Sequence, residues 1–283
     1  MSKKATLIIA ITLILLGALL FAGVMTMLKW NFGKLSTVKY ETNEHIISEA
    51  FYGISISSNT ARIVFQPSEN GLVSVVCHEP TNLRHSVSVS EGVLKIEIAD
   101  TRKWYEHIAL DFGSPTVTVS LPPSAYGELQ IKNATGSITV PIDFSFASAT
   151  ITTSTGALDF SASVEGMLKI KTSTGSIRAG ALTAGDLEIS VSTGKITLED
   201  LISEGDMTLR TDTGNIRLSR CDAAAININT DTGSVIGTLL SEKLFDAKSA
   251  TGKVSVPAPS GVEPCKIRTD TGSIRIEIAE KTE

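Results

Sequence analysis

The chain has 283 residues, of which 42% are hydrophobic and 19% charged, a composition that indicates a folded protein and excludes an intrinsically disordered one. Aromatic residues make up only 5%, so the core must be mainly aliphatic. The net charge of −5 argues against a nucleic-acid partner, because nucleic-acid binding requires a basic surface. No histidine follows His107, so the second half of the chain lacks the commonest general base and metal ligand.

An uncharged apolar run near the amino terminus extends from Ala5 to Leu28. As a helix it would span about 36 Å, enough to cross the roughly 30 Å hydrocarbon core of a bilayer. The alternative is a cleaved signal peptide, whose apolar region is normally about 7–15 residues long and is followed by a small-x-small site. No such site is present around Ala22 and Gly23. We therefore expect an uncleaved transmembrane anchor over residues 1–29, followed by a polar linker over 30–50.

The orientation of this anchor is not decided by charge, because lysines flank it on both sides. Lys3 and Lys4 precede the run, while Lys29, Lys34 and Lys39 follow it. A short tail before a single anchor and a long domain after it favour an exported domain. We expect the carboxyl-terminal domain to be extracytoplasmic.

The dipeptide Thr-Gly recurs eight times at intervals of 19 or 20 residues, a period typical of solenoids. The residue five places before each glycine is aliphatic, and so is the residue two places after it. Apolar and polar residues alternate on both sides of the glycine, as in strands with one buried face. The eight glycines lie at positions 136, 156, 175, 194, 214, 233, 252 and 272.

The inward-facing positions change parity across each Thr-Gly, which indicates a corner that glycine can form without a Cβ clash. A helical interpretation fails, since no apolar i, i+3, i+4 pattern persists across a repeat. The pattern therefore predicts an all-β fold: a parallel β-solenoid of eight 19–20-residue rungs over residues 129–283, in which each rung gives strands to two or three sheets. Charges that alternate with Ile274, Ile276 and Ile278 are expected to protect the last edge.

Residues 51–128 are also rich in β-forming residues but lack the period. We expect this region to cap the first rung, because an open sheet edge invites aggregation. Its predicted strands cover residues 55–57, 61–65, 72–77, 86–89, 93–98 and 116–121.

The recurrent Thr-Gly-x-Ile rungs, preceded by Gly92-Val93-Leu94-Lys95-Ile96 and Val117-Thr118-Val119-Ser120-Leu121-Pro122, resemble the DUF4097 β-strand-repeat family in its membrane-anchored form. Members of this family are also called adhesins. The resemblance covers about residues 51–283 and implies a β-strand-repeat fold on a membrane anchor in the bacterial cell envelope. It implies no catalytic residue, because the family has no established one.

Two columns of polar residues recur with the repeat. A threonine precedes all eight glycines, and five more stand two places earlier, at Thr153, Thr172, Thr211, Thr230 and Thr269. Their odd parity predicts a buried column whose hydroxyls bond neighbouring hydroxyls or corner backbone groups; a row that binds ice or a glycan is the alternative. Asp212, Asp231 and Asp270 stand two places before their glycines, in a column that Ala250 interrupts. Basic residues two places earlier predict a solvated ion-pair face rather than a Ca²⁺ site. Those basic residues are Lys132, Lys171, Arg210, Lys248 and Arg268.

No catalytic, cofactor-binding or metal-binding residues are expected. Residues 129–283 contain no Trp, Tyr or His, and their acidic residues are scattered rather than paired. Cys221 and Cys265 should lie about two rungs apart and stay reduced. The one candidate partner contact is Trp104 with Tyr105, two large aromatics among charges, for which a capping loop is the alternative.

Three functions are compatible with these features. The first is a non-enzymatic, membrane-anchored scaffold or adhesin-like protein whose partner is an envelope protein or a cell-wall polymer. The second is a cytoplasmic-facing regulator of an envelope-stress signalling protein, and the third is a polysaccharide-processing enzyme. We favour the first.

Overall fold

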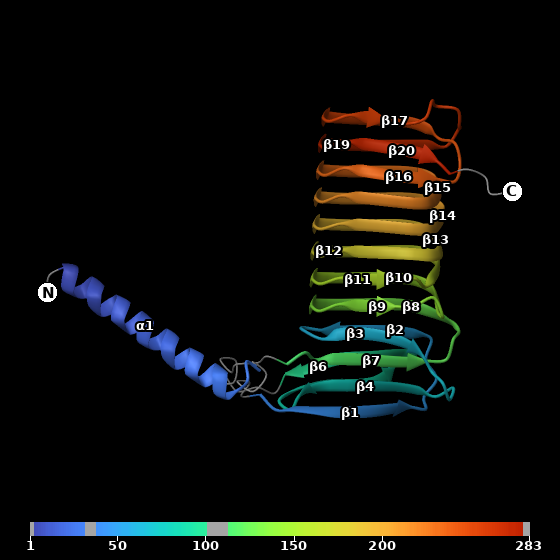
Figure 1. Ribbon diagram of the computed structural model, residues 1–283. Coiled ribbons are helices and arrows are strands. Elements are labelled where there is room, and N and C mark those ends of the chain that lie inside the picture. The colour runs from blue at the N-terminus through green and yellow to red at the C-terminus, as the bar shows by residue number, and fades with distance from the viewer. Residues whose placement is uncertain (1–2, 32–37, 101–112, 280–283) are drawn as a thin grey trace.

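The structure is a computed structural model that describes residues 3–31, 38–100 and 113–279. It contains one helix, α1 (Lys3–Met27), and a long column of stacked strands (Figure 1). The helix is long and apolar enough to cross a membrane, and no part of its most apolar stretch is buried against the protein. The strands form one continuous hydrogen-bonded β-structure.

The predicted parallel β-solenoid is confirmed. Its rungs form what we call the column, in which each strand pairs in parallel with the equivalent strand of the next rung. The strands of the column are β8 (Ala125–Thr135), β9 (Ile138–Val140), β10 (Ser145–Thr155), β11 (Leu158–Phe160), β12 (Ser163–Thr174), β13 (Ile177–Thr193), β14 (Ile196–Thr213), β15 (Ile216–Thr232), β16 (Val235–Leu239), β17 (Leu244–Thr251), β18 (Val254–Ser255), β19 (Pro264–Thr271) and β20 (Ile274–Ile278).

The repeated glycines form the first corner of each rung, as predicted. All eight have φ between 126° and 158°, a region that side chains other than glycine rarely adopt. They also stack on one another: a Cβ added to Gly194 would lie 1.9 Å from the carbonyl oxygen of Gly175, one rung below. Further corners follow at left-handed residues such as Asp200 and at the register shift beside Gly185, so the column has three sides.

Aliphatic ladders fill the interior of the column. Ile189 pairs with Ile170 on one side and Leu209 on the other, and all three side chains are buried. Its neighbour Glu188 faces outward, where its carboxylate lies 2.7 Å from Lys169 Nζ. The predicted strand parity before the corner is therefore correct.

The prediction of a buried threonine column directly before the glycines is wrong. All eight of these threonines are exposed, because the chain begins to turn before the glycine and rotates this position outward. The buried polar column lies two residues earlier, where buried Thr230 and Thr269 and half-buried Ser249 donate hydrogen bonds to glycine carbonyls of neighbouring rungs at 2.8–3.3 Å. The predicted buried threonine column is therefore correct at this earlier position, where Thr230 and Thr269 bond the corner backbone as expected.

The region before the column, which we call the cap, adds two further parallel layers and an antiparallel end. In the parallel layers, β2 lies between β6 and β8, and β3 lies between β7 and β9. Antiparallel strands then close this end, since β5 pairs with β6 and β4 with β7. The strands are β2 (Gly53–Ser58), β3 (Arg62–Pro67), β4 (Val73–Pro80), β5 (Leu83–Ser90), β6 (Val93–Asp100) and β7 (Thr116–Leu121).

The linker predicted over residues 30–50 contains a strand, so that prediction is wrong in part. β1 (Tyr40–Ile47) pairs antiparallel with β4 at the outer end of the cap. Its more buried positions include Glu41, Asn43 and His45, which are polar, so hydrophobic alternation did not reveal the strand. Backbone pairing and polar contacts hold it in place, including a 3.0 Å hydrogen bond from Asn43 Nδ2 to Glu79 Oε1.

The last rungs do not stack in sequence order. β19 lies between β15 and β17, and β20 lies between β16 and β18, so the eighth rung sits directly on the sixth (Figure 1). The terminal edge is consequently formed mainly by β17 and β18, and the prediction that residues 274–278 form it is wrong in part: β18 covers residues 274–275, whereas residues 276–278 pair only with β16. Ile274 lies between Val235 and Val254, and the side chains of Ile274 and Ile276 are both buried.

Candidate binding surface

The stacking order changes the predicted aspartate column. Asp212, Asp231 and Asp270 occupy consecutive rungs, and Ala250 lies beyond them rather than between them. Asp212 lies 3.5 Å from Arg210, in partial agreement with the predicted ion-pair face, whereas Arg268 pairs with Asp246 instead.

The cysteines are free, as predicted. The predicted separation of two rungs between Cys221 and Cys265 is wrong. Cys265 pairs with Ile226, and Ile226 lies in the rung directly after the one that contains Cys221.

One side of the column, formed by the strands that precede the corner glycines, is basic. Seven basic residues point outward there, six and four places before the glycines, where the acids are Glu188 and Asp246; Asp212, Asp231 and Asp270 lie farther along the same strands, two places before the glycines. Three of the seven, Lys169, Lys248 and Arg268, are paired with Glu188 or Asp246, and Arg210 is paired with Asp212. We call this surface the basic side; its residues are Lys132, Lys169, Lys171, Arg210, Lys248, Lys266 and Arg268.

A hollow of about 360 Å³ lies in the basic side where the eighth rung meets the sixth. Three cations, Arg210, Lys266 and Arg268, surround the amides of Asn227 and Asn229. The amides come from β15, which lies between β14 and β19, so shorter side chains are flanked by longer basic ones. Guanidinium, ammonium and amide groups all donate hydrogen bonds, which makes this a surface suited to an anion.

The third side of the column carries the opposite charge. It follows the second corner, and Arg220 is paired with Asp200 at its edge. The protein therefore has a strong charge asymmetry that its net charge of −5 conceals. The acidic residues of this side are Glu165, Asp186, Asp200, Glu204, Asp206, Asp222, Glu242 and Glu263.

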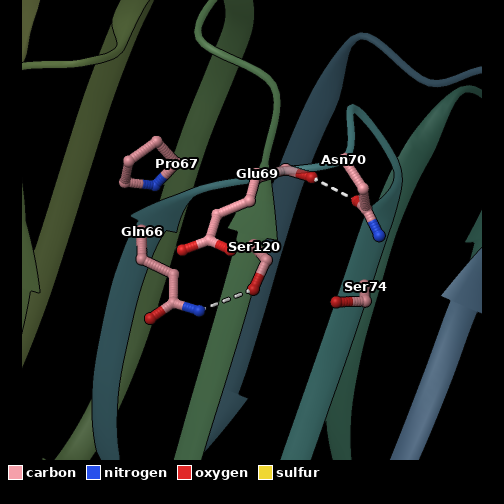
Figure 2. A pocket seen from close by; sticks show the side chains of 7 residues that line it. Gln66, Pro67, Glu69, Asn70, Ser74 and Ser120 are labelled. Carbon is pink, nitrogen blue, oxygen red and sulfur yellow. Dashed lines mark hydrogen bonds between the residues drawn. The ribbon is translucent and has the colours of Figure 1, made fainter.

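A polar hollow of about 470 Å³ lies in the cap, beside the turn between β3 and β4 (Figure 2). Gln66 Nε2 donates a 3.0 Å hydrogen bond to Ser120 Oγ, and Ser68 Oγ donates one of 2.9 Å to Asn70 Oδ1. Glu69 is its single ionisable lining residue. This hollow therefore lacks the paired groups that acid–base catalysis requires.

Buried polar groups also gather at the other end of the cap strands. Ser58 Oγ lies 3.1 Å from His85 Nε2, and His85 Nδ1 lies 2.6 Å from Glu79 Oε2. Cys77 is buried next to them, and burial together with the charge of Glu79 raises its pKa to about 12. This group is not predicted by the sequence pattern, because Ser58, Glu79 and His85 each lie just beyond the end of a predicted strand.

The predicted partner contact at Trp104 and Tyr105 falls in residues 101–112, outside the described part of the chain. The structure consequently provides no geometry for that prediction.

The family model of DUF4097, described as Toastrack, matches residues 51–283. The chain belongs to the DUF4097 family. The match begins just before β2 and takes in the rest of the cap and the whole column. A search of curated proteins gave no match.

Several solved structures are similar to this DUF4097 protein. One is a putative adhesin from Bacteroides fragilis NCTC 9343, with 15% identity and a TM-score of 0.46 over 84% of this chain and 97% of that one. Another is a putative adhesin from Parabacteroides merdae ATCC 43184, with 15% identity and a TM-score of 0.47 over 86% and 98%. A third, a putative lipid binding protein from Parabacteroides distasonis ATCC 8503, has 12% identity and a TM-score of 0.34 over 86% and 98%.

Proposed function

We propose that the protein is a non-enzymatic, membrane-anchored scaffold that binds an anionic polymer of the bacterial cell envelope outside the cytoplasmic membrane. The observation that carries this proposal is the basic side, which runs along the column of a chain that is acidic overall. Lys132, Lys171 and Lys266 of that side make no ion pair with another described residue, so their ammonium groups are free to meet a partner.

The shape of the column suits a long partner better than a small one. Stacked rungs repeat about every 4.8 Å, and the basic residues lie on the first, third, fifth, seventh and eighth rungs, so the basic side presents charges one or two rungs apart along a rigid surface. A polymer with repeated phosphate or carboxylate groups can contact several rungs together. In this proposal the hollow around Arg210, Lys266 and Arg268 is the strongest single contact, and α1 holds the column at the membrane.

Binding is tested with the full chain in detergent, sedimented with cell-wall sacculi that retain their anionic polymers or have been stripped of them. We expect binding to the untreated sacculi alone, weakened by added salt. The double substitution Lys171→Glu with Lys266→Glu should weaken binding about tenfold, which corresponds to about 1.4 kcal/mol. A matched control, Arg217→Glu with Arg275→Glu, makes the same charge change on another side and should bind normally. Equal loss in both variants would contradict a specific basic side.

The side of the membrane is tested by protease treatment of intact cells. An exported column should be cut at exposed turns while a cytoplasmic control protein survives. If the column is cut only after lysis, the cytoplasmic-facing regulator replaces this proposal.

A further inference from the structure

The cap buries three side chains whose ligand atoms are close enough to share one metal ion. Cys77 and Glu79 are two residues apart on β4, so both face inward, and His85 follows on β5. The thiol sulfur, a carboxylate oxygen and a ring nitrogen all lie within 4.8 Å of one another. Cys77 and Glu79 are fully buried, and His85 is 6% exposed. The spacing Cys-x-Glu-x₅-His thus becomes a compact cluster across one turn.

Other side chains hold these groups in the orientation that a metal requires. Asn43 Nδ2 donates to Glu79 Oε1 at 3.0 Å, while Oε2 accepts the backbone N–H of His85 at 2.7 Å and lies 2.6 Å from His85 Nδ1. The opposite ring nitrogen, Nε2, lies 3.1 Å from Ser58 Oγ. Metal-bound histidines usually bond their second nitrogen to an oxygen group, which fixes the ring. Ser58 and Asn43 occupy the places of such supporting residues.

We propose that Cys77 Sγ, Glu79 Oε2 and His85 Nδ1 bind one Zn²⁺ ion. Binding displaces the thiol proton and the proton on Nδ1, and both leave to solvent, while Nε2 keeps a proton that it donates to Ser58 Oγ, so that the imidazole binds as a neutral ligand. The thiolate and the carboxylate then neutralise the two charges of the ion, which suits a buried site. Sulfur and imidazole ligands favour zinc over Mg²⁺ or Ca²⁺. Three protein ligands leave the fourth tetrahedral position for water.

The same atoms also form the sequence of contacts found in a Ser-His-acid catalytic triad. That interpretation requires Ser58 to meet a substrate, but Ser58 is only 6% exposed. It pairs with Asn133 of the first rung, so its hydroxyl belongs to the buried polar column of the stack. The metal interpretation needs no access for a substrate and also accounts for Cys77.

The test titrates the full chain, stripped with a chelator and kept in detergent, with Co²⁺ as a spectroscopic probe. We expect one equivalent to bind with a thiolate-to-cobalt charge-transfer band and tetrahedral ligand-field bands, both abolished by competing Zn²⁺. Cys77→Ser should lose the charge-transfer band. Cys221→Ser, which removes another buried cysteine, should keep it.

A second variant covers the outcome in which Cys77→Ser does not fold, as judged by circular dichroism. Ser58→Ala leaves all three ligands in place and should retain the band while it weakens metal affinity at least tenfold, as loss of a supporting residue does. The proposal is overturned if the wild-type chain shows no charge-transfer band, if folded Cys77→Ser keeps it, or if Ser58→Ala binds as tightly as wild type.

Discussion

The column and the cap are both built from stacked strands, but they place their side chains by different rules. In the column, equivalent positions of successive rungs hold the same kind of residue, as at Ile170, Ile189 and Leu209, so each rung is supported by its neighbours. In the cap the strands follow no repeat, and buried positions hold Glu79 and His85. Repetition thus produces a uniform scaffold, whereas departures from it produce individual sites.

The largest effect that would sharpen this comparison is expected at a corner glycine of the column. A methyl group at Gly194 would collide with the carbonyl of Gly175 in a φ region that disfavours side chains. We expect Gly194→Ala to cost about 4 kcal/mol or more of the free energy of unfolding, because backbone atoms of two rungs must move. Chemical denaturation of the full chain in detergent measures it.

The matched control lies in the cap. Gly71 also has a positive φ, of 74°, but nothing lies within 4 Å of an added Cβ. Gly71→Ala should therefore cost only about 1–2 kcal/mol, the strain of the left-handed conformation alone. Equal losses of unfolding free energy at the two glycines would show that the stacking of glycines in the column adds nothing to the cost of the substitution.

The next effect concerns the aliphatic ladder. Ile189→Ala removes buried methyl and methylene groups and should cost about 2–5 kcal/mol. Glu188→Ala, one residue away, should stay within about 0.5 kcal/mol, because the Glu188–Lys169 pair is solvent-exposed. Hydrogen exchange should show that the Ile189 change loosens adjacent rungs before the cap. A larger effect from Glu188 would mean that the strand parity is wrong.

A smaller effect is expected at the end of the column, where buried Lys243 bonds Asp222, Glu263 and the carbonyl of Ala223. Burial alone would lower the pKa of Lys243, but the bonds to the two carboxylates outweigh it and hold the pKa above its ordinary value. Lys243→Met leaves two acids without their cation and should cost about 1–3 kcal/mol, since both acids are partly exposed.

Thermal unfolding of the Lys243→Met variant provides the measurement. The lost stability should reappear when Asp222→Asn and Glu263→Gln are added, because no unpaired charge then remains. A triple variant that is no more stable than Lys243→Met would contradict the role of charge at this position.

The column could be predicted from the sequence because its period repeats eight times and its corners need glycine. The position of the exposed threonines could not, since alternation alone does not show where a strand begins to turn. The strand at residues 40–47 could not be predicted, because its more buried residues are polar. The cluster of Ser58, Glu79 and His85 could not be predicted either, because tertiary contacts between strand ends leave no periodic pattern in the sequence.

The stacking order of the last rungs tests the central claim most directly, namely that the repeat determines where side chains point but not which rungs are neighbours. Asp231 and Asp270 lie in adjacent rungs, whereas Asp231 and Ala250 lie two rungs apart. Cysteines at adjacent exposed positions, about 4.8 Å apart, can form a disulfide, and those about 9.6 Å apart cannot. We predict that Asp231→Cys with Asp270→Cys crosslinks under mild oxidation of the full chain, while Asp231→Cys with Ala250→Cys does not. The reverse result would show that the rungs stack in sequence order and would contradict this structure.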